Sequence, residues 1–79
     1  MLHRKVIGEN LRRIRKARGW SQERLSDKSL LDQDYVGRLE RGQVNVSVDT
    51  LARLAKTLNV EIVDFFKADK SATVDKGGG

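Results

Sequence analysis

The sequence predicts a small all-α protein, a compact domain of five helices in which the second and third form a helix-turn-helix. Three observations support this prediction. The chain has 79 residues, which is enough for one domain with a modest hydrophobic core. Apolar residues recur at helical spacing in several stretches. Between Trp20 and Gly42, capping and stop residues outline two short helices that are separated by a tight turn.

The first helix is expected over residues 5–18, with residues 1–5 frayed. Its inward positions follow the i, i+4, i+7 spacing that places side chains on one face of a helix. These positions are Ile7, Leu11, Ile14 and Arg18, with Ala17 beside them. The Arg and Lys residues between them are interpreted as a solvated cationic face, and Gly19 is expected to end the helix.

Two short helices are predicted next. Ser21 suits an N-cap because its hydroxyl can accept a hydrogen bond from an unpaired amide of the first turn, which indicates a helix over residues 22–29. Asp32 is expected to cap the following helix, which runs to about Arg41 before Gly42 stops it. Two helices joined by a turn of roughly three or four residues form a helix-turn-helix, and its second helix is the candidate DNA reader.

The rest of the chain is predicted to hold a loop over residues 43–47 and a helix over residues 48–58. Ser47 or Asp49 is the candidate N-cap, and Asn59 is expected to end the helix. A last short helix over residues 61–67 contains more large apolar residues than one core usually needs. Some are therefore expected to face a second subunit, with simple closure of the core as the alternative. These residues are Ile62, Val63, Phe65 and Phe66.

The predicted domain organisation is a DNA-binding domain over residues 1–67 followed by a disordered tail over residues 68–79, which are small, polar and without periodicity. The charge is uneven along the chain. Residues 1–42 hold 11 Lys and Arg against 6 Asp and Glu, whereas residues 43–79 hold 5 of each. A basic first half suggests a polyanion such as nucleic acid as the partner, and a merely soluble basic surface is the alternative.

The residues needed for several other functions are missing. With one histidine, His3, and no cysteine, the chain offers no convincing Cys–His pair or Ser–His–Asp triad, and we expect no enzyme activity. No cluster has metal-ligand spacing, and no cofactor or small-molecule ligand is indicated. No apolar stretch is long enough to span a membrane, and the N-terminus lacks the apolar core of a signal peptide. A cytoplasmic location is therefore predicted.

A set of residues in and around the two short helices resembles the Cro/repressor-type helix-turn-helix family, the phage-repressor fold. The resemblance rests on Gly19, Ser21, Gln22, Leu25, Tyr35, Val36, Leu39, Glu40, Arg41 and Gly42, and it extends over about residues 7–66. The D-x-x-Y start of the second short helix and the lack of proline near Val46 are similar to controller proteins of restriction-modification systems. The resemblance implies that Arg15 and Glu40 form a structural ion pair.

The resemblance also implies DNA-backbone contacts in two places. Gln22 begins the first motif helix, and Arg41, Gln43 and Asn45 lie in and near the loop after the second. Tyr35 is expected either to touch a phosphate or to pack, with a thymine methyl as a further possibility. The residue types themselves predict base contacts from the outward side of the second helix. Gln33 can pair with adenine, Arg38 with guanine, and Asp34 can accept from cytosine.

Two positions depart from the family pattern. Leu30 stands in the turn where the family usually has glycine; if the backbone there is left-handed, leucine costs on the order of 1 kcal/mol, and otherwise the turn has shifted. Gly37 lies inside the second motif helix, where it costs roughly 1 kcal/mol relative to alanine. It either allows a close approach to DNA or has no functional role.

Together these features predict a sequence-specific DNA-binding transcriptional regulator. We expect a homodimer that occupies an operator of two half-sites in double-stranded DNA and either represses or activates. The alternative is an antitoxin or another protein-interaction module that uses the same fold.

Overall fold

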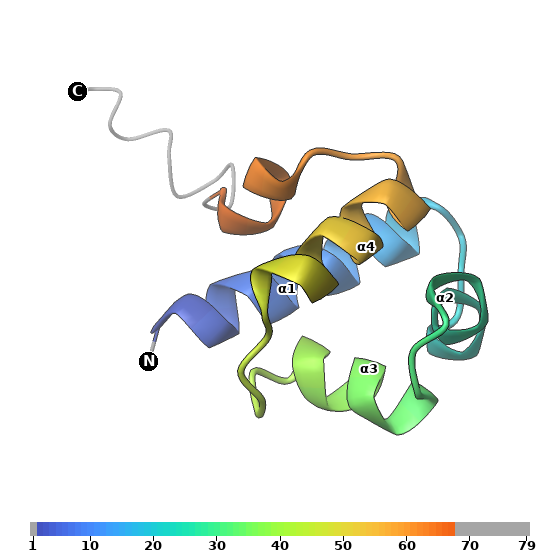
Figure 1. Ribbon diagram of the computed structural model, residues 1–79, viewed down its shortest axis with the longest axis horizontal. Helices are drawn as coiled ribbons and strands as arrows, with labels where there is room; N and C mark the ends of the chain where they lie inside the picture. Colours follow the sequence, from blue (N-terminus) through green and yellow to red (C-terminus); the bar gives the residue numbers. More distant parts are fainter. Residues whose placement is uncertain (1, 68–79) are drawn as a thin grey trace.

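The structure is a computed structural model that describes residues 2–67. Within this range it contains four α-helices, one 3-10 helix and no strand (Figure 1). The elements are α1 (Leu2–Ala17), α2 (Gln22–Ser29), α3 (Gln33–Glu40), α4 (Val48–Leu58) and η1 (Ile62–Phe66). The predicted all-α class is confirmed, with the fifth helix of the tighter 3-10 type. The predicted disordered tail, residues 68–79, lies outside the described residues.

The first helix differs from its prediction at both ends. It begins at Leu2, so the prediction of a frayed segment through Lys5 was wrong. Its first turns have support from the chain after α3, where a Cβ added to Gly42 would stand 3.2 Å from Lys5 Cα. At the other end, Ala17 is exposed rather than inward, and Arg18 follows the helix. The Arg18 guanidinium donates to the backbone oxygen of Leu58, which ties the end of α1 to the end of α4.

The helix-turn-helix is packed onto the other elements through both of its helices. α3 packs against α1 and α2, α2 also packs against α4, and η1 packs against α1 and α4. In Figure 1, α3 lies at the lower edge of the molecule and α2 at its right edge. Among the described residues, no helix has both the length and the apolar character that crossing a membrane would require.

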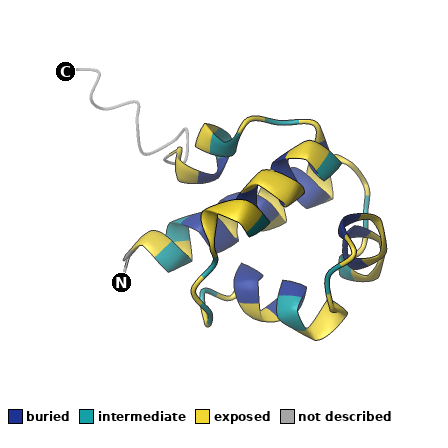
Figure 2. Cartoon of the chain, viewed as in Figure 1, coloured by how far each residue is buried: buried dark blue, intermediate teal, exposed yellow. Residues whose placement is uncertain are grey.

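The hydrophobic core draws on all five elements. Burial of these side chains is the main favourable contribution to folding, at roughly 25 cal/mol for each Å² of apolar surface removed from water. The core residues are Ile7, Leu11, Ile14, Leu25, Val36, Leu39, Leu51, Leu54, Ala55, Leu58 and Phe65. Figure 2 shows that the buried residues of α3 face the rest of the molecule, whereas its exposed residues lie along the outer side.

The predicted helix caps are confirmed. The Ser21 hydroxyl accepts from the N–H of Arg24 at 3.0 Å, and the Asp32 carboxylate accepts from two amides of the first turn of α3. Of the two candidates for α4, Ser47 is the cap, because its hydroxyl accepts from the N–H of Thr50 at 3.0 Å. Each cap satisfies an amide that has no partner within the helix, which explains why the helices begin at these residues.

The turn between α2 and α3 contains a left-handed leucine. Leu30 has φ 61° and ψ 39°, and its N–H donates to the backbone oxygen of Ser26. The side chain is 83% exposed, so packing contributes little in return for the unfavourable backbone conformation. Of the two alternatives for this position, the turn has therefore kept the family's left-handed geometry with leucine in place of glycine. Asn59, which ends α4 as predicted, is also left-handed, with φ 60°.

Phe65 is fully buried, so the prediction that this residue faces a second subunit is wrong. The side-chain amide of Asn10 donates to the backbone oxygens of Phe65 and Lys67, both at 2.8 Å. These bonds hold η1 against α1, and Phe65 lies within the core. Of the other apolar residues of η1, Val63 is 58% exposed and Phe66 46% exposed. Ile62 is partly buried against the core.

Asp64 connects the two ends of η1. Its carboxylate accepts from the N–H of Glu61 at 2.9 Å and pairs with Lys67 Nζ at 2.7 Å. The Lys67 ammonium and the Glu61 amide hold the pKa of the Asp64 carboxyl below its usual value of 3.8, because both favour the charged form. The stabilisation from a lowered pKa is present above the pKa of the unfolded carboxyl, and it is lost as pH falls through the folded pKa.

Candidate DNA-binding surface

The outward face of α3 presents polar side chains. Gln33, Asp34 and Arg38 are exposed, whereas Val36 and Leu39 are buried on the opposite side. This division follows from the helical repeat, because residues three and four apart share a face. All three predicted base-contact residues therefore lie on the accessible side of the second motif helix, within its first two turns.

A groove lies between the start of α2 and the outward face of α3. We call it the α2–α3 groove, and its lining residues are Gln22, Gln33, Asp34, Gly37 and Arg41. It brings together two of the predicted base-contact residues and two of the predicted backbone-contact residues. Arg38 does not line it, but Arg38 Nε lies 3.3 Å from Asp34 Oδ2 at its edge.

The Asp34–Arg38 pair keeps opposite charges together on the candidate reading face. The two side chains are 74% and 56% exposed, and they are one helical turn apart. An exposed ion pair with this spacing contributes only about 0.3–0.5 kcal/mol to folding stability. Both side chains are therefore available to base edges at little cost, with Arg38 suited to guanine and Asp34 to the amino group of cytosine.

A buried ion pair joins α1 to the last turn of α3. Arg15 Nε donates to Glu40 Oε2 at 2.6 Å and Arg15 Nη2 donates to Glu40 Oε1 at 3.0 Å, and each residue is 7% exposed. Arg15 Nη1 also donates to the backbone oxygen of Trp20 at 2.7 Å. The structure thus brings the two expected partners together in the two-pronged geometry that a planar guanidinium and a carboxylate favour.

The same carboxylate orients a predicted DNA contact. Gln22 Nε2 donates to Glu40 Oε1 at 3.0 Å. An ionised carboxylate only accepts hydrogen bonds, so the nitrogen end of the Gln22 amide must face Glu40. The oxygen end points toward Gly37, where a Cβ would stand 3.4 Å from Gln22 Oε1.

Three of the predicted backbone-contact residues lie in and around the loop after α3. Arg41, Gln43 and Asn45 are exposed, and Arg41 Nε donates to Gln43 Oε1 at 3.3 Å. Tyr35 is partly buried and packs against the core, in agreement with the packing alternative. Gly37 also lines the groove, whereas the sequence left open whether this residue has a functional role. The i, i+4, i+8 spacing of Gln33, Gly37 and Arg41 is a signal in the sequence that could have placed these three residues along one side of α3.

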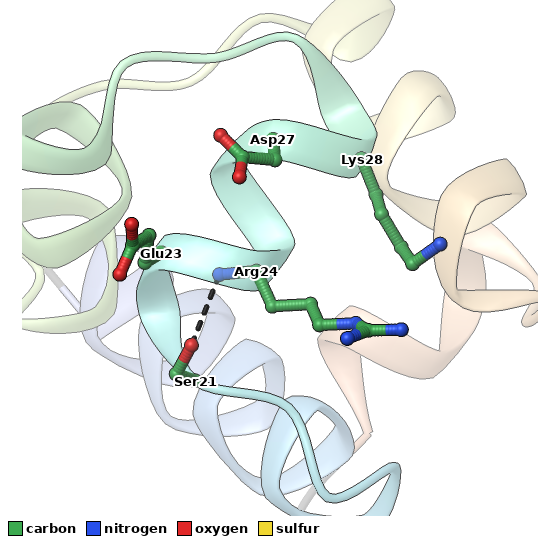
Figure 3. A pocket seen from close by; sticks show the side chains of 5 residues that line it. All are labelled: Ser21, Glu23, Arg24, Asp27 and Lys28. Carbon is green, nitrogen blue, oxygen red and sulfur yellow. Dashed lines mark hydrogen bonds between the residues drawn. The ribbon is translucent and has the colours of Figure 1, made fainter.

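A second hollow lies on α2, lined by Ser21, Glu23, Arg24, Asp27 and Lys28 (Figure 3). Figure 3 shows the two carboxylates on one side of the helix and the two cations on the other. The Lys28 ammonium lies 5.5 Å from the centre of the Trp20 ring, a cation–π contact. The residues that line this hollow include none from α3, whereas the α2–α3 groove is lined by the second motif helix, so that groove is the better candidate for DNA.

A helix-turn-helix whose second helix presents exposed polar side chains on its outward face is typical of a DNA-binding transcriptional regulator. Residues 11–65 match the helix-turn-helix family, and the chain belongs to that family. Among its relatives, the uncharacterized HTH-type transcriptional regulator y4dJ of Sinorhizobium fredii strain NGR234 is 41% identical over 61 residues. The match spans 77% of this chain and 79% of the relative.

Two solved structures of restriction-modification controller proteins share the fold, in agreement with the similarity to such proteins that the sequence indicates. C.AhdI from Aeromonas hydrophila has a TM-score of 0.80 at 42% identity, over 84% of this chain and all of that chain. C.Esp1396I, solved as a tetramer in complex with its natural 35 base-pair operator, has a TM-score of 0.76 at 32% identity. That match covers 84% of this chain and 87% of the other.

Proposed function

We propose that the protein regulates transcription by binding, as a homodimer, an operator composed of two half-sites in double-stranded DNA. The observation that carries the proposal is the outward face of α3, where Gln33, Asp34 and Arg38 are all exposed beside the α2–α3 groove. A recognition helix enters the major groove with its N-terminal residues toward the base edges. These three residues are the proposed base contacts.

The proposed backbone contacts flank this reading face. Gln22 lies at the start of α2, Tyr35 lies within α3, Arg41 is the C-cap of α3, and Gln43 and Asn45 lie in the loop that follows. Exposed amides and cations suit phosphate oxygens, and such contacts fix the register of a protein on the duplex without selecting a sequence. Regulation then requires occupancy of the operator alone, so the protein needs no enzymatic chemistry. It acts where the regulated DNA is, which we place in the cytoplasm.

The proposed dimer is supported by the exposed apolar residues of η1. Val63 and Phe66 present large apolar side chains to solvent, and Ile62 lies between core and surface. A two-fold interface uses the same patch on both subunits. In such a dimer, the two recognition helices would lie about 34 Å apart and read half-sites one helical turn apart. The controller protein C.Esp1396I, a relative, is a tetramer on its 35 base-pair operator.

The first experiment selects bound duplexes from a random pool and sequences them, which also tests the rival function. A dominant palindromic sequence supports the proposal. A protein that selects no sequence, but captures a specific protein in a pull-down, would instead be an interaction module such as an antitoxin.

The second experiment separates reading from positioning. Arg38→Ala is expected to cost about 1–3 kcal/mol in operator binding and to relax preference at one base pair in each half-site. Affinities are measured on the operator and on its single-base variants. Arg24→Ala is the matched control, because Arg24 is an exposed arginine on the other hollow of α2. If Arg38→Ala weakens every variant equally, Arg38 contacts phosphate and does not read a base.

A further inference from the structure

Gly37 is a buried position of α3, covered by the ends of two polar side chains. A Cβ added to Gly37 would stand 3.3 Å from Arg41 Nη1 and 3.4 Å from Gln22 Oε1. The neighbouring atoms are thus the ends of two polar side chains, one from α2 and one from the C-cap of α3. Gly37 and these two side chains line the α2–α3 groove together with Gln33 and Asp34.

The position of the Arg41 guanidinium follows from the direction of side chains on a helix. A side chain on an α-helix points back toward the N-terminus, over the preceding turn. Arg41 therefore reaches back one turn and places its guanidinium over Gly37, inside the groove. A Cβ at position 37 would press on Arg41 Nη1, and the guanidinium would have to move by a few tenths of an ångström.

This position brings a cation toward the part of α3 that faces base edges. The N-terminal residues of a recognition helix make the base contacts, and an arginine at the C-cap would otherwise lie too far along the helix to join them. Arg41 Nε donates to Gln43 Oε1 at 3.3 Å, which engages the inner nitrogen of the guanidinium. A two-pronged contact to O6 and N7 of guanine would then use the two terminal nitrogens.

We propose that Gly37 and Arg41 act together as a specificity-determining pair, in which Gly37 provides the space for the Arg41 guanidinium to read a guanine. The inference rests on the proposed DNA-binding function and changes the role assigned to Arg41, from a phosphate contact to a base contact. Gln22 completes the arrangement, because Glu40 holds its amide with the oxygen directed to the same space.

The test uses Gly37→Ala, Arg41→Ala and the double variant, on the selected operator and its single-base variants at two salt concentrations. Replacing one particular base pair in each half-site is expected to weaken binding by the wild type about tenfold, because the contact from Arg41 is lost. Both single variants should bind the operator and this single-base variant with nearly equal affinity. The double variant should discriminate no less than either single variant, because the two residues act on one contact.

Arg41→Lys separates base reading from phosphate contact. Lysine keeps the positive charge but lacks the planar two-pronged group. If Arg41 reads a base, Arg41→Lys loses the same base preference while the salt dependence of binding stays close to that of the wild type. The melting temperature of Gly37→Ala shows whether this variant is folded. It should rise, because alanine favours the helix and the end of the Arg41 side chain can move aside.

Two outcomes overturn the proposal while the proposed function stands. In the first, Gly37→Ala binds with every base preference of the wild type intact. In the second, Arg41→Ala weakens all duplexes equally and Arg41→Lys restores binding to all of them, which identifies a phosphate contact. By contrast, a wild type that selects no sequence at all overturns the proposed function, and with it this inference.

Discussion

Glu40 joins the buried ion pair to a proposed backbone contact, because its carboxylate accepts from both Arg15 and Gln22. Replacing one partner of a buried ion pair leaves the other charge without compensation, at a cost of about 3–5 kcal/mol. Glu40→Ala is therefore expected to lower the melting temperature sharply, as measured by thermal unfolding monitored by circular dichroism. A fall of only a degree or two would show that solvent compensates the Arg15 charge.

Leu30 gives a prediction of the opposite sign. A left-handed conformation costs an ordinary residue roughly 1–2 kcal/mol, and glycine avoids this cost. Part of the gain is offset because glycine has more conformational entropy to lose on folding. Since the side chain is 83% exposed, little packing is lost, and Leu30→Gly should be neutral or stabilising in urea denaturation.

Asn59 provides the matched control for Leu30, because it is also left-handed but asparagine tolerates that conformation. Asn59→Gly should therefore gain less than Leu30→Gly. Clear destabilisation by Leu30→Gly would mean that the leucine side chain has a partner, such as a second protein molecule, that offsets its backbone cost.

At the scale of elements, the crossing of α1 over the end of α3 depends on Gly8. A Cβ added there would stand 2.4 Å from the backbone oxygen of Leu39 and 2.6 Å from that of Glu40. Backbone atoms cannot move aside as a side-chain tip can, so Gly8→Ala must push the two helices apart. The steric cost is expected to exceed the approximately 1 kcal/mol that alanine gains in helix propensity, so the variant should be less stable than the wild type.

Gly37→Ala is the control for this prediction, because it adds the same methyl group to a helical glycine whose nearest neighbours are flexible side-chain ends. Denaturation curves of the two variants should shift in opposite directions. If Gly8→Ala is as stable as the wild type, α1 and α3 do not cross this closely.

The sequence could predict the elements better than their contacts. Caps at Ser21, Asp32 and Ser47 act over two or three residues, so the boundaries of three helices could be read from local residue types. The tight crossing at Gly8 depends on residues more than thirty positions away, and spacing along one helix contains no signal for it. The same limit applies to η1. Its sequence shows four apolar residues, but which of them closes the core depends on contacts with distant elements, and the structure identifies Phe65.

At the scale of the whole molecule, the proposed dimer makes Phe65 and Phe66 adjacent residues with opposite roles. Phe66 is 46% exposed, so Phe66→Glu removes apolar surface from the proposed interface and leaves the core of each subunit intact. The variant should keep the circular dichroism spectrum of the wild type. In sedimentation at micromolar concentration it should be a monomer where the wild type is a dimer.

The DNA readout distinguishes loss of the dimer from damage to the reading face. Two linked subunits bind a two-half-site operator more tightly than one, because the second binding event occurs within the complex. Phe66→Glu should therefore weaken binding to the full operator while leaving affinity for an isolated half-site unchanged. Phe65→Ala, by contrast, opens a core cavity and should cost about 3–5 kcal/mol of folding stability, weakening binding to both duplexes through unfolding. If the wild type is a monomer both free and on the full operator, the exposed side chains of η1 have another use and the two half-sites are not read by a dimer.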